Sequence, residues 1–333
     1  MQKLSDKPVF IVGMPRSGTS LLLALLSAHP NIAITPETQY FGIWMRMYRH
    51  LDARKPQDFE LFWKALSTGR HFLRLELDAD RVYERSQNMG CSYRSLFTAI
   101  LQEYSAARGK SRWGEKSPRH FAYLSTLFEW YPDAQVLFAL RDPRACIASS
   151  VRAPWGNPSV YSQSIVWNES MDCYEKYKDD PRVLTVRYED VVRDREPELQ
   201  RICTFLEEEY TPKLLDHSTH SSFSDYQPSH GMWGVRHKEK YMQPISEEHV
   251  EKWKTQLSVG QIEAIESIIE EKMRQYGYSP LSNKLHTRGR LRLLASKLFS
   301  GPGIAKPISQ LWLLHHLWHV PTSWLLSRLK KLR

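Results

Sequence analysis

Residues 13 to 20, with the sequence GMPRSGTS, combine glycine, a cation and hydroxyl groups in the spacing of a phosphate-binding loop. Four residues separate Gly13 from Gly18. In loops of this spacing, backbone N–H groups and the N-terminus of the following helix hold phosphate oxygens. Arg16 lies inside the loop and adds a permanently charged donor. Hydroxyl donors are available at Ser17, Thr19 and Ser20. The pattern predicts an anion site.

The residue after Gly18 restricts the kind of anion site. A P-loop nucleoside triphosphatase needs Lys at this position to reach the β- and γ-phosphates, and this chain has Thr19. The cation is inside the loop instead, at Arg16. A P-loop-type kinase is therefore disfavoured, and it stays as an alternative that predicts Mg²⁺-dependent binding of ATP.

A second anion site is indicated farther along the chain. The apolar run AQVLFAL, residues 134–140, leads directly into Arg141. Arg141 therefore lies at the carboxyl end of a predicted strand, where open α/β sheets bind ligands. Ser149 follows after one helical stretch and can donate a hydroxyl to the same phosphate. The alternative is that Asp142 caps a helix beside a solvated Arg141. Two anion sites on one sheet suit a nucleotide with phosphates at two positions.

The elements that must position these residues follow from short apolar runs. Runs of strand length occur at residues 9–12, 31–35, 134–140 and 182–186, and the stretches between them are long enough for helices. Buried parallel strands have this pattern. The predicted fold class is α/β, with a P-loop-like parallel β-sheet flanked by helices.

The remaining segments predict an insert and a tail. Residues from about 40 to 110 are rich in aromatic and charged side chains at helical spacing, which predicts a helical insert over the functional edge of the sheet. From Glu247 the sequence predicts two amphipathic helices, closed by Gly277 and Pro280. We therefore expect a domain over residues 1–280 and a basic amphipathic helical tail over residues 281–333.

The net charge of +9 comes from this tail. Residues 281–333 contain ten basic side chains and no Asp or Glu, so the rest of the chain has a net charge of −1. A nucleic-acid-binding surface over the main body is therefore not predicted. The tail carries Trp312, Trp318 and Trp324 among leucines, and either it lies at a membrane surface or it packs back on the domain.

Cysteine content and the N-terminus indicate the compartment. Four cysteines without a C-x-x-C pair are too sparse for a disulfide framework or a zinc site. The apolar run at residues 9–12 is too short for a signal peptide or a membrane span. We expect a cytoplasmic protein, and peripheral membrane contact is one of the two alternatives for residues 281–333. No His, Asp and Glu cluster has metal-ligand spacing, so no metal is expected.

With both anion sites in place, the sequence resembles a known family. FIVGMPRSGTSLL, residues 10–22, resembles the 5′-phosphosulfate loop of sulfotransferases that use 3′-phosphoadenosine 5′-phosphosulfate (PAPS). The spacing of Arg141 and Ser149 resembles their 3′-phosphate site, and residues 186–190, which include Tyr188, resemble their element beneath adenine. Residues 13–38 are more similar to the tyrosylprotein and bacterial branch than to the cytosolic phenol and steroid branch. The resemblance implies PAPS as the sulfuryl donor.

The same resemblance implies the catalytic residues. Sulfuryl transfer needs a base for the acceptor proton and positive charge at the leaving oxygen. Glu37 matches the Glu that acts as base in the tyrosylprotein branch, and Lys116 matches the lysine near the transferring group. We expect Arg16 to act with Lys116. Glu115 and His120 are rival bases, because the cytosolic branch uses a His from this part of the fold.

Two further features concern the acceptor and the donor. Gln39 stands where the tyrosylprotein branch has an Arg that faces the peptide, which argues against peptide sulfation. Lys238 and Lys240 are additional candidates for contact with the 3′-phosphate. The predicted function is sulfuryl transfer from PAPS to a hydroxyl of a carbohydrate, lipid-linked or secondary-metabolite acceptor. The alternatives are sulfation of protein tyrosine, the kinase, and a membrane adaptor whose nucleotide fold has decayed.

Overall fold

The computed structural model describes residues 4–153, 157–215 and 245–281. Five parallel strands form one sheet in the order β2-β3-β1-β4-β5. The strands are β1 (Val9–Gly13), β2 (Ile32–Thr35), β3 (Arg112–Lys116), β4 (Gln135–Leu140) and β5 (Val183–Arg187). The predicted parallel α/β sheet is thereby confirmed. Chain order changes direction at β1, which has β3 on one side and β4 on the other.

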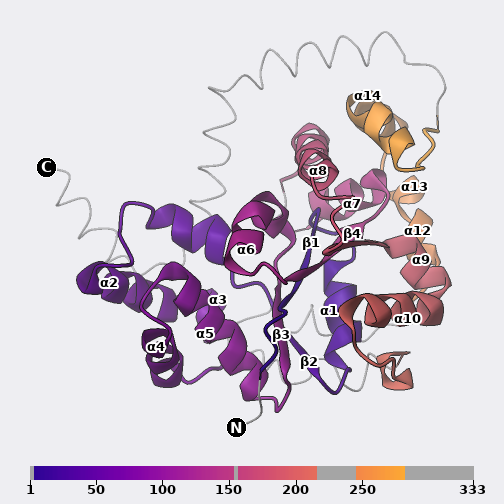
Figure 1. The fold of residues 1–333 in the computed structure, drawn as a ribbon. Helices are drawn as coiled ribbons and strands as arrows, with labels where there is room; N and C mark the ends of the chain where they lie inside the picture. Colours follow the sequence, from indigo (N-terminus) through magenta and orange to yellow (C-terminus); the bar gives the residue numbers. More distant parts are fainter. Residues whose placement is uncertain (1–3, 154–156, 216–244, 282–333) are drawn as a thin grey trace, which may run out of the picture. The chain divides into compact units, whose positions relative to one another are not determined.

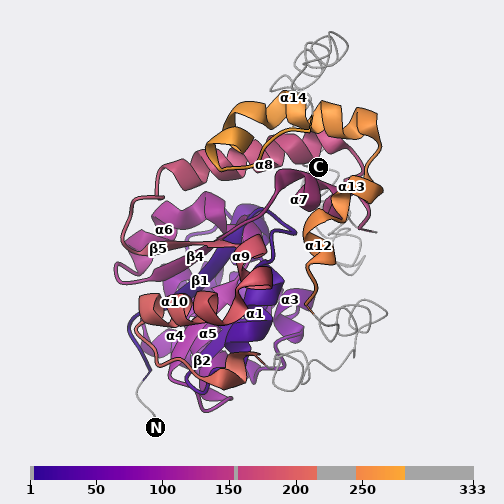
Figure 2. The same cartoon turned by 90° about the vertical axis from the view of Figure 1, so that its right-hand side faces the viewer.

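Side chains of the strands alternate between the two faces of the sheet. Val9 belongs to a core cluster with leucines of α1 (Thr19–Ser27) and apolar residues of α10 (Arg195–Leu206). Phe10 packs on the opposite face, where its ring lies 6.3 Å from that of Phe97 in α5 (Tyr93–Ala106). On the same face, the ring centroid of Phe138 lies 4.6 Å from that of Tyr174 in α8 (Val160–Glu175). The sheet is a middle layer between two helical layers (Figures 1 and 2).

The predicted helical insert follows β2. It comprises a π-helix η1 (Tyr40–Met45) and the helices α2 (Pro56–Ser67), α3 (Arg70–Leu73), α4 (Ala79–Asn88) and α5. In Figure 1 these elements lie together on one side of the sheet, in the indigo to purple part of the colour scale. Among them α5 packs directly on β2 and β3. The insert therefore covers the half of the sheet from which Glu37 emerges.

The other elements complete the layers and the C-terminal part. They are η2 (Pro118–Tyr123), α6 (Leu124–Trp130), α7 (Pro143–Val151), α9 (Tyr188–Arg193), η3 (Pro212–Leu215), α12 (Glu248–Glu251), α13 (Trp253–Gln256) and α14 (Val259–Gln275). The first of the two helices predicted from Glu247 is therefore split into α12 and α13. The second begins where Ser258 and Gln261 form a reciprocal capping box. The predicted tail, residues 281–333, lies outside the described residues except for Leu281.

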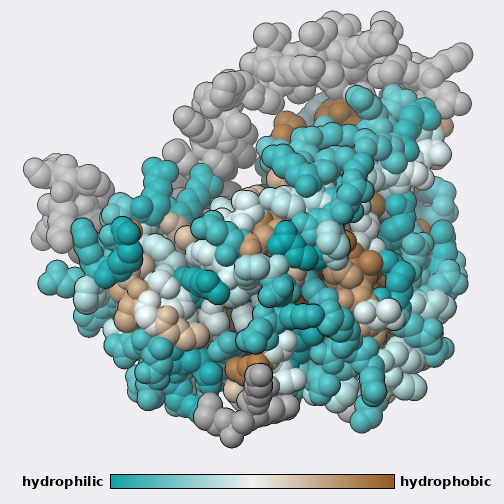
Figure 3. All heavy atoms as spheres, in the orientation of Figure 1, coloured by the Kyte–Doolittle hydropathy of each residue, from teal (hydrophilic) through white to brown (hydrophobic). Residues whose placement is uncertain are grey.

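The surface of the described residues is mostly polar. On the face in Figure 3, apolar residues appear as separate patches between hydrophilic ones. The large hydrophobic side chains that are exposed are Leu61, Leu73, Met89, Ile165, Val259 and Leu281. Within the described ranges, no helix combines the length and the hydropathy needed to cross a bilayer.

Gly114 in β3 is a point at which the sheet admits no side chain. A Cβ at this position would lie 1.9 Å from the carbonyl oxygen of Val9 in β1. We expect Gly114→Ala to lower the free energy of unfolding by about 3 kcal/mol or more, because the clash is with the backbone of a neighbouring strand. Urea unfolding followed by circular dichroism measures the change.

The matched control is Gly260→Ala in α14, where no heavy atom lies within 4 Å of the added Cβ. There we expect no loss, and a gain of at most about 1 kcal/mol from helix propensity. Equal stability of both variants would contradict the steric assignment of Gly114.

Candidate active site

The carboxyl ends of all five strands carry residues that the sequence singled out. Glu37 lies two residues beyond β2, and Lys116 is the last residue of β3. The loop over residues 14–18 follows β1, Arg141 follows β4, and Tyr188 follows β5. Because the strands are parallel, these positions meet at one edge of the sheet, at the point where the strand order reverses. Lys116 and Arg141 are thereby placed on opposite sides of the loop.

The loop after β1 has the backbone of an anion-binding turn. Gly13 and Gly18 have φ values of 144° and 101°, which disfavour side chains. A Cβ on Gly13 would lie 2.4 Å from the carbonyl oxygen of Ala139, and one on Gly18 would lie 2.6 Å from the ring of Tyr188. The hydroxyl of Ser17, which is 1% exposed, has no hydrogen-bond partner among the described residues. A buried, unpaired donor in this turn fits an anion.

Helix α1 begins directly after the loop, at Thr19 and Ser20. Its first turn contains no acidic residue, and the described side chains provide no cap for its N-terminal N–H groups. Such groups carry a partial positive charge. Together with the hydroxyls, they supply the donors that an anion needs at this position.

Arg16, Ser149 and Arg141 converge at the β4 side of the loop. The Nε of Arg16 donates to Ser149 Oγ at 2.8 Å. Arg141 donates to the carbonyl oxygen of Arg16 at 3.1 Å and to that of His249 in α12 at 2.7 Å. Its guanidinium lies 3.8 Å from the ring centroid of Tyr188, and its buried Nε has no partner among the described residues. Residues 133 positions apart in the sequence thus share one cationic cluster.

Glu37 and Lys116 form an ion pair at the other side of the loop. Lys116 Nζ lies 2.7 Å from Glu37 Oε1, with Lys116 6% and Glu37 36% exposed in their side chains. Gln39 donates to Glu37 Oε2 at 2.8 Å. Burial raises the pKa of Glu37, but the charge and hydrogen bond of Lys116 outweigh it and hold this pKa at about 2. Glu37 is therefore a carboxylate at neutral pH with both oxygens engaged.

The rival bases Glu115 and His120 pair with each other beneath this site. Each is 1% exposed, and His120 Nδ1 lies 2.7 Å from Glu115 Oε2. The other carboxylate oxygen accepts hydrogen bonds from the backbone and hydroxyl of Thr38 and from Ser117. Burial raises the pKa of Glu115, but His120 and these hydrogen bonds lower it below its usual value. The pair fixes the loop that carries Glu37.

Comparison with known proteins identifies the family. A model of the sulfotransferase family matches residues 8–212, more than half of the chain. The chain belongs to the sulfotransferase family. It is 32% identical over 151 residues to nodulation protein NoeE of Sinorhizobium fredii, covering 45% of this chain and 32% of that protein. It is 26% identical over 290 residues to the protein-tyrosine sulfotransferase of Drosophila melanogaster, and this match covers 83% of this chain and 52% of that protein. The chain thus spans about a third and about half of the length of these relatives.

The fold of this sulfotransferase family member also has a solved counterpart. The sulfotransferase domain from the Synechococcus PCC 7002 olefin synthase superposes with a TM-score of 0.58 at 20% identity. The match covers 84% of this chain and 97% of that domain. At this level of identity the similarity concerns the fold.

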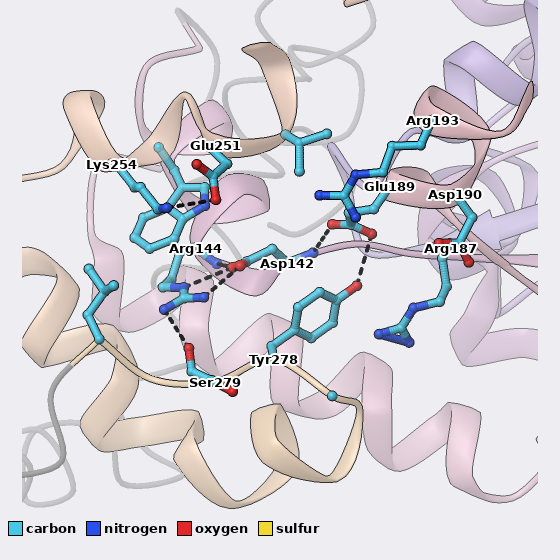
Figure 4. A pocket seen from close by; sticks show the side chains of 14 residues that line it. Asp142, Arg144, Arg187, Glu189, Asp190, Arg193, Glu251, Lys254, Tyr278 and Ser279 are labelled. Carbon is cyan, nitrogen blue, oxygen red and sulfur yellow. Dashed lines mark hydrogen bonds and ion pairs between the residues drawn. The ribbon is translucent and has the colours of Figure 1, made fainter. Parts of the chain in front are cut away.

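A charged network supports the strand end that carries Arg141 in this sulfotransferase family member (Figure 4). The N–H of Asp142 donates to Glu189 at 2.9 Å, and Tyr278 donates to the same carboxylate at 3.1 Å. Arg144 pairs with Asp142 and with Glu266, both at 2.7 Å. Asp142, Arg144, Glu189 and Tyr278 line a cavity of about 340 Å³ that neither Glu37 nor Arg16 lines. The network therefore holds Arg141 in place from outside the site.

Sequence reasoning missed three contributors to the site. Glu189 and Arg144 fix the residue after Arg141, and His249 receives a hydrogen bond from Arg141. Asp142 caps α7 as well, by accepting from the N–H of Arg144. The helix-capping motif that includes Arg144 was visible in the sequence, whereas Glu189 and His249 lie in segments too distant to be recognised. Lys238 and Lys240 lie outside the described residues. Within the described ranges, no group of three or more His, Cys, Asp or Glu could hold a metal.

Proposed function

We propose that this chain transfers the sulfuryl group of PAPS to a hydroxyl group of an acceptor. One observation carries the proposal: a cationic cluster of Arg16, Ser149 and Arg141 lies on one side of the phosphate loop, and the Glu37–Lys116 pair follows on the other. The cationic cluster and the loop together fit a nucleotide with two separate phosphate groups. The Glu37–Lys116 pair fits proton transfer beside a developing negative charge.

The donor fits the residues at the β4 and β5 side of the loop. Arg141 and Ser149 would hold the 3′-phosphate, and Tyr188 would lie beneath adenine, as the family resemblance implies. The 5′-phosphosulfate would take the loop N–H groups and Arg16. Its hydroxyl donors would be Ser17, Thr19 and Ser20. Ser17 and the Nε of Arg141 are buried donors that lack partners among the described residues, and an anion would satisfy both.

In the reaction, a bond forms between the acceptor oxygen and sulfur, and the bond from sulfur to the bridging oxygen of the phosphosulfate breaks. The acceptor proton goes to Glu37. The electron pair of the broken bond stays on the leaving bridging oxygen, where Lys116 and Arg16 stabilise its charge. The products are the sulfated acceptor and adenosine 3′,5′-bisphosphate. Glu115 and His120, each 1% exposed, lack the access to solvent that an acceptor needs.

The ion pair of Glu37 bears on the timing of this step. A carboxylate with a pKa of about 2 is a weak proton acceptor at neutral pH. If Lys116 turns from Glu37 toward the leaving oxygen, the charge that lowers this pKa is withdrawn, and burial then raises it. Lys116 would thus stabilise the leaving group and release the base in one movement.

As the acceptor, we expect a hydroxyl of a carbohydrate, lipid-linked or secondary-metabolite compound. The Drosophila relative is a protein-tyrosine sulfotransferase, so a tyrosine phenol is the alternative. Gln39 argues against it, because its amide donates to Glu37 rather than offering the charge of an Arg to a peptide.

The donor is tested by calorimetric titration of the purified chain with adenosine 3′,5′-bisphosphate, beside ATP with Mg²⁺. We expect saturable binding of the bisphosphate, because both phosphates meet cationic groups, and at least about tenfold weaker binding of ATP. Radiolabelled PAPS with a tyrosine peptide, a chitin oligosaccharide and a prenyl alcohol then tests the acceptor. Binding of ATP with Mg²⁺ and no binding of the bisphosphate would favour the kinase.

A further inference from the structure

A side chain of the helical insert, that of His71, contacts the backbone of Glu37. His71 Nδ1 lies 3.2 Å from the carbonyl oxygen of Glu37. His71 belongs to α3, 34 residues farther along the chain, and is 6% exposed. The imidazole therefore joins the insert to the loop that leaves β2.

The neighbours of His71 fix which of its nitrogens carries the proton. The Nε of Arg70 donates to His71 Nε2 at 3.3 Å. A guanidinium N–H can only donate, so Nε2 must offer its lone pair. In a neutral ring the proton is then on Nδ1, which donates it to the carbonyl of Glu37.

The charge state of His71 agrees with this assignment. The pKa of His71 is lowered to about 3, mainly by burial and also by the nearby guanidinium groups of Arg74 and Arg70, while Glu37 raises it by less. The ring is therefore neutral over the whole physiological range. A neutral Nδ1–H donor gives a hydrogen bond that does not change with pH in this range.

The insert segment that carries His71 is itself seated tightly. Gly69 precedes α3, and a Cβ there would lie 2.2 Å from the ring of Trp44 in η1. Since η1 begins only three residues after Glu37, α3 packs against the continuation of the same loop. Between Glu37 and η1, the backbone N–H of Thr38 donates to Glu115 Oε1 at 2.9 Å. The carboxylate-bearing residue is thus bracketed by contacts on both sides.

We propose that His71 is a positioning residue: its Nδ1–H holds the carbonyl of Glu37 and thereby fixes the place of the carboxylate relative to Lys116. The proposal rests on the proposed function, in which Glu37 is the base. His71 does not touch the reacting atoms. Its effect on rate comes through the geometry of Glu37, because misplaced catalytic groups lose rate steeply with distance.

Two substitutions separate hydrogen bonding from packing. His71→Phe keeps a planar ring and removes the donor, whereas the amide nitrogen of His71→Asn occupies nearly the place of Nδ1. We expect kcat to fall by about 3- to 10-fold in His71→Phe, with the KM for PAPS unchanged, and to recover to within about twofold of wild type in His71→Asn. The readout is release of radiolabelled sulfate from PAPS to water, together with transfer to the acceptor panel named above. His50→Phe, an exposed position of the insert, is the matched control.

The kinetic results distinguish a failure of the His71 proposal from a failure of the proposed function. Wild-type rates in His71→Phe would overturn the proposal. Equal losses in His71→Phe and His71→Asn would also overturn it, because the ring itself rather than its donor would then matter. A wild-type chain that neither binds the bisphosphate nor consumes PAPS would instead refute the proposed function.

A measurement on the unliganded protein tests the proton assignment without any activity. Long-range ¹H–¹⁵N correlation spectra distinguish the two neutral tautomers, and the signal missing in His71→Asn identifies His71. We expect an unprotonated Nε2 and no titration from about pH 5 to 8. A protonated Nε2, or a ring that titrates in this range, would contradict the hydrogen bond to Glu37.

Discussion

Replacing Glu37 by Gln is expected to lower kcat by about 10²- to 10⁴-fold, the usual contribution of a general base. The Kd for adenosine 3′,5′-bisphosphate is expected to stay within about twofold of wild type. The reason is the division of the site by β1. Glu37 contacts Lys116 and Gln39 on the β2 and β3 side, whereas the cationic cluster lies on the β4 side. Gln keeps the shape of Glu and removes only the proton acceptor.

Steady-state kinetics with PAPS and isothermal calorimetry measure the two quantities. The matched control is Glu60→Gln on the exposed side of α2, which should change neither. The pH profile of kcat gives a second test. Protonation of Glu37 removes the base, so kcat of the wild type falls as the pH falls toward the pKa of Glu37, which is about 2 while Lys116 contacts it. This acidic limb should be absent from Glu37→Gln. A loss of bisphosphate affinity equal to the loss of kcat would contradict the separation of roles.

Local patterns in the sequence predicted several of the candidate site residues. The phosphate loop follows a β-branched run and precedes a leucine-rich helix, so both its element and its place at the sheet edge could be predicted. Arg141 was found in the same way, from the apolar run before it. Parallel strands then bring their carboxyl ends to one edge regardless of the spacing between them in the chain.

What escaped prediction depends on tertiary packing. Glu37, Glu115 and His120 were three candidate bases, and their burial could not be read from the sequence. In the structure Glu115 and His120 are 1% exposed and paired with each other. His71 carried no signal at all, because its partner lies 34 residues earlier in the chain. The bond between Arg16 and Ser149 spans 133 positions. Such contacts arise from the way layers stack, which periodicity does not encode.

The division of the site predicts the opposite result for Arg141. In Arg141→Ala, we expect the Kd for adenosine 3′,5′-bisphosphate to rise by about 10- to 150-fold, because a charge-assisted hydrogen bond contributes about 1.5–3 kcal/mol. The substitution also removes the donor to the carbonyl of Arg16, so the loop loses a support. Arg141→Lys should be intermediate, since an ammonium group keeps the charge and loses the fork geometry.

Calorimetry at two salt concentrations measures the effect of Arg141→Ala, and Arg152→Ala at the exposed end of α7 is its matched control. Since Arg141 is supported by the Asp142–Glu189–Arg144 network rather than by the Glu37 loop, kcat at saturating PAPS should fall far less than affinity. An unchanged Kd would place the 3′-phosphate elsewhere. A fall in kcat as large as that in Glu37→Gln, with affinity intact, would mean that Arg141 serves the reaction rather than the nucleotide. A loss of kcat alone in Glu37→Gln and a loss of affinity alone in Arg141→Ala would establish separate roles for the two sides of β1. The β4 side binds the donor, and the β3 side removes the proton.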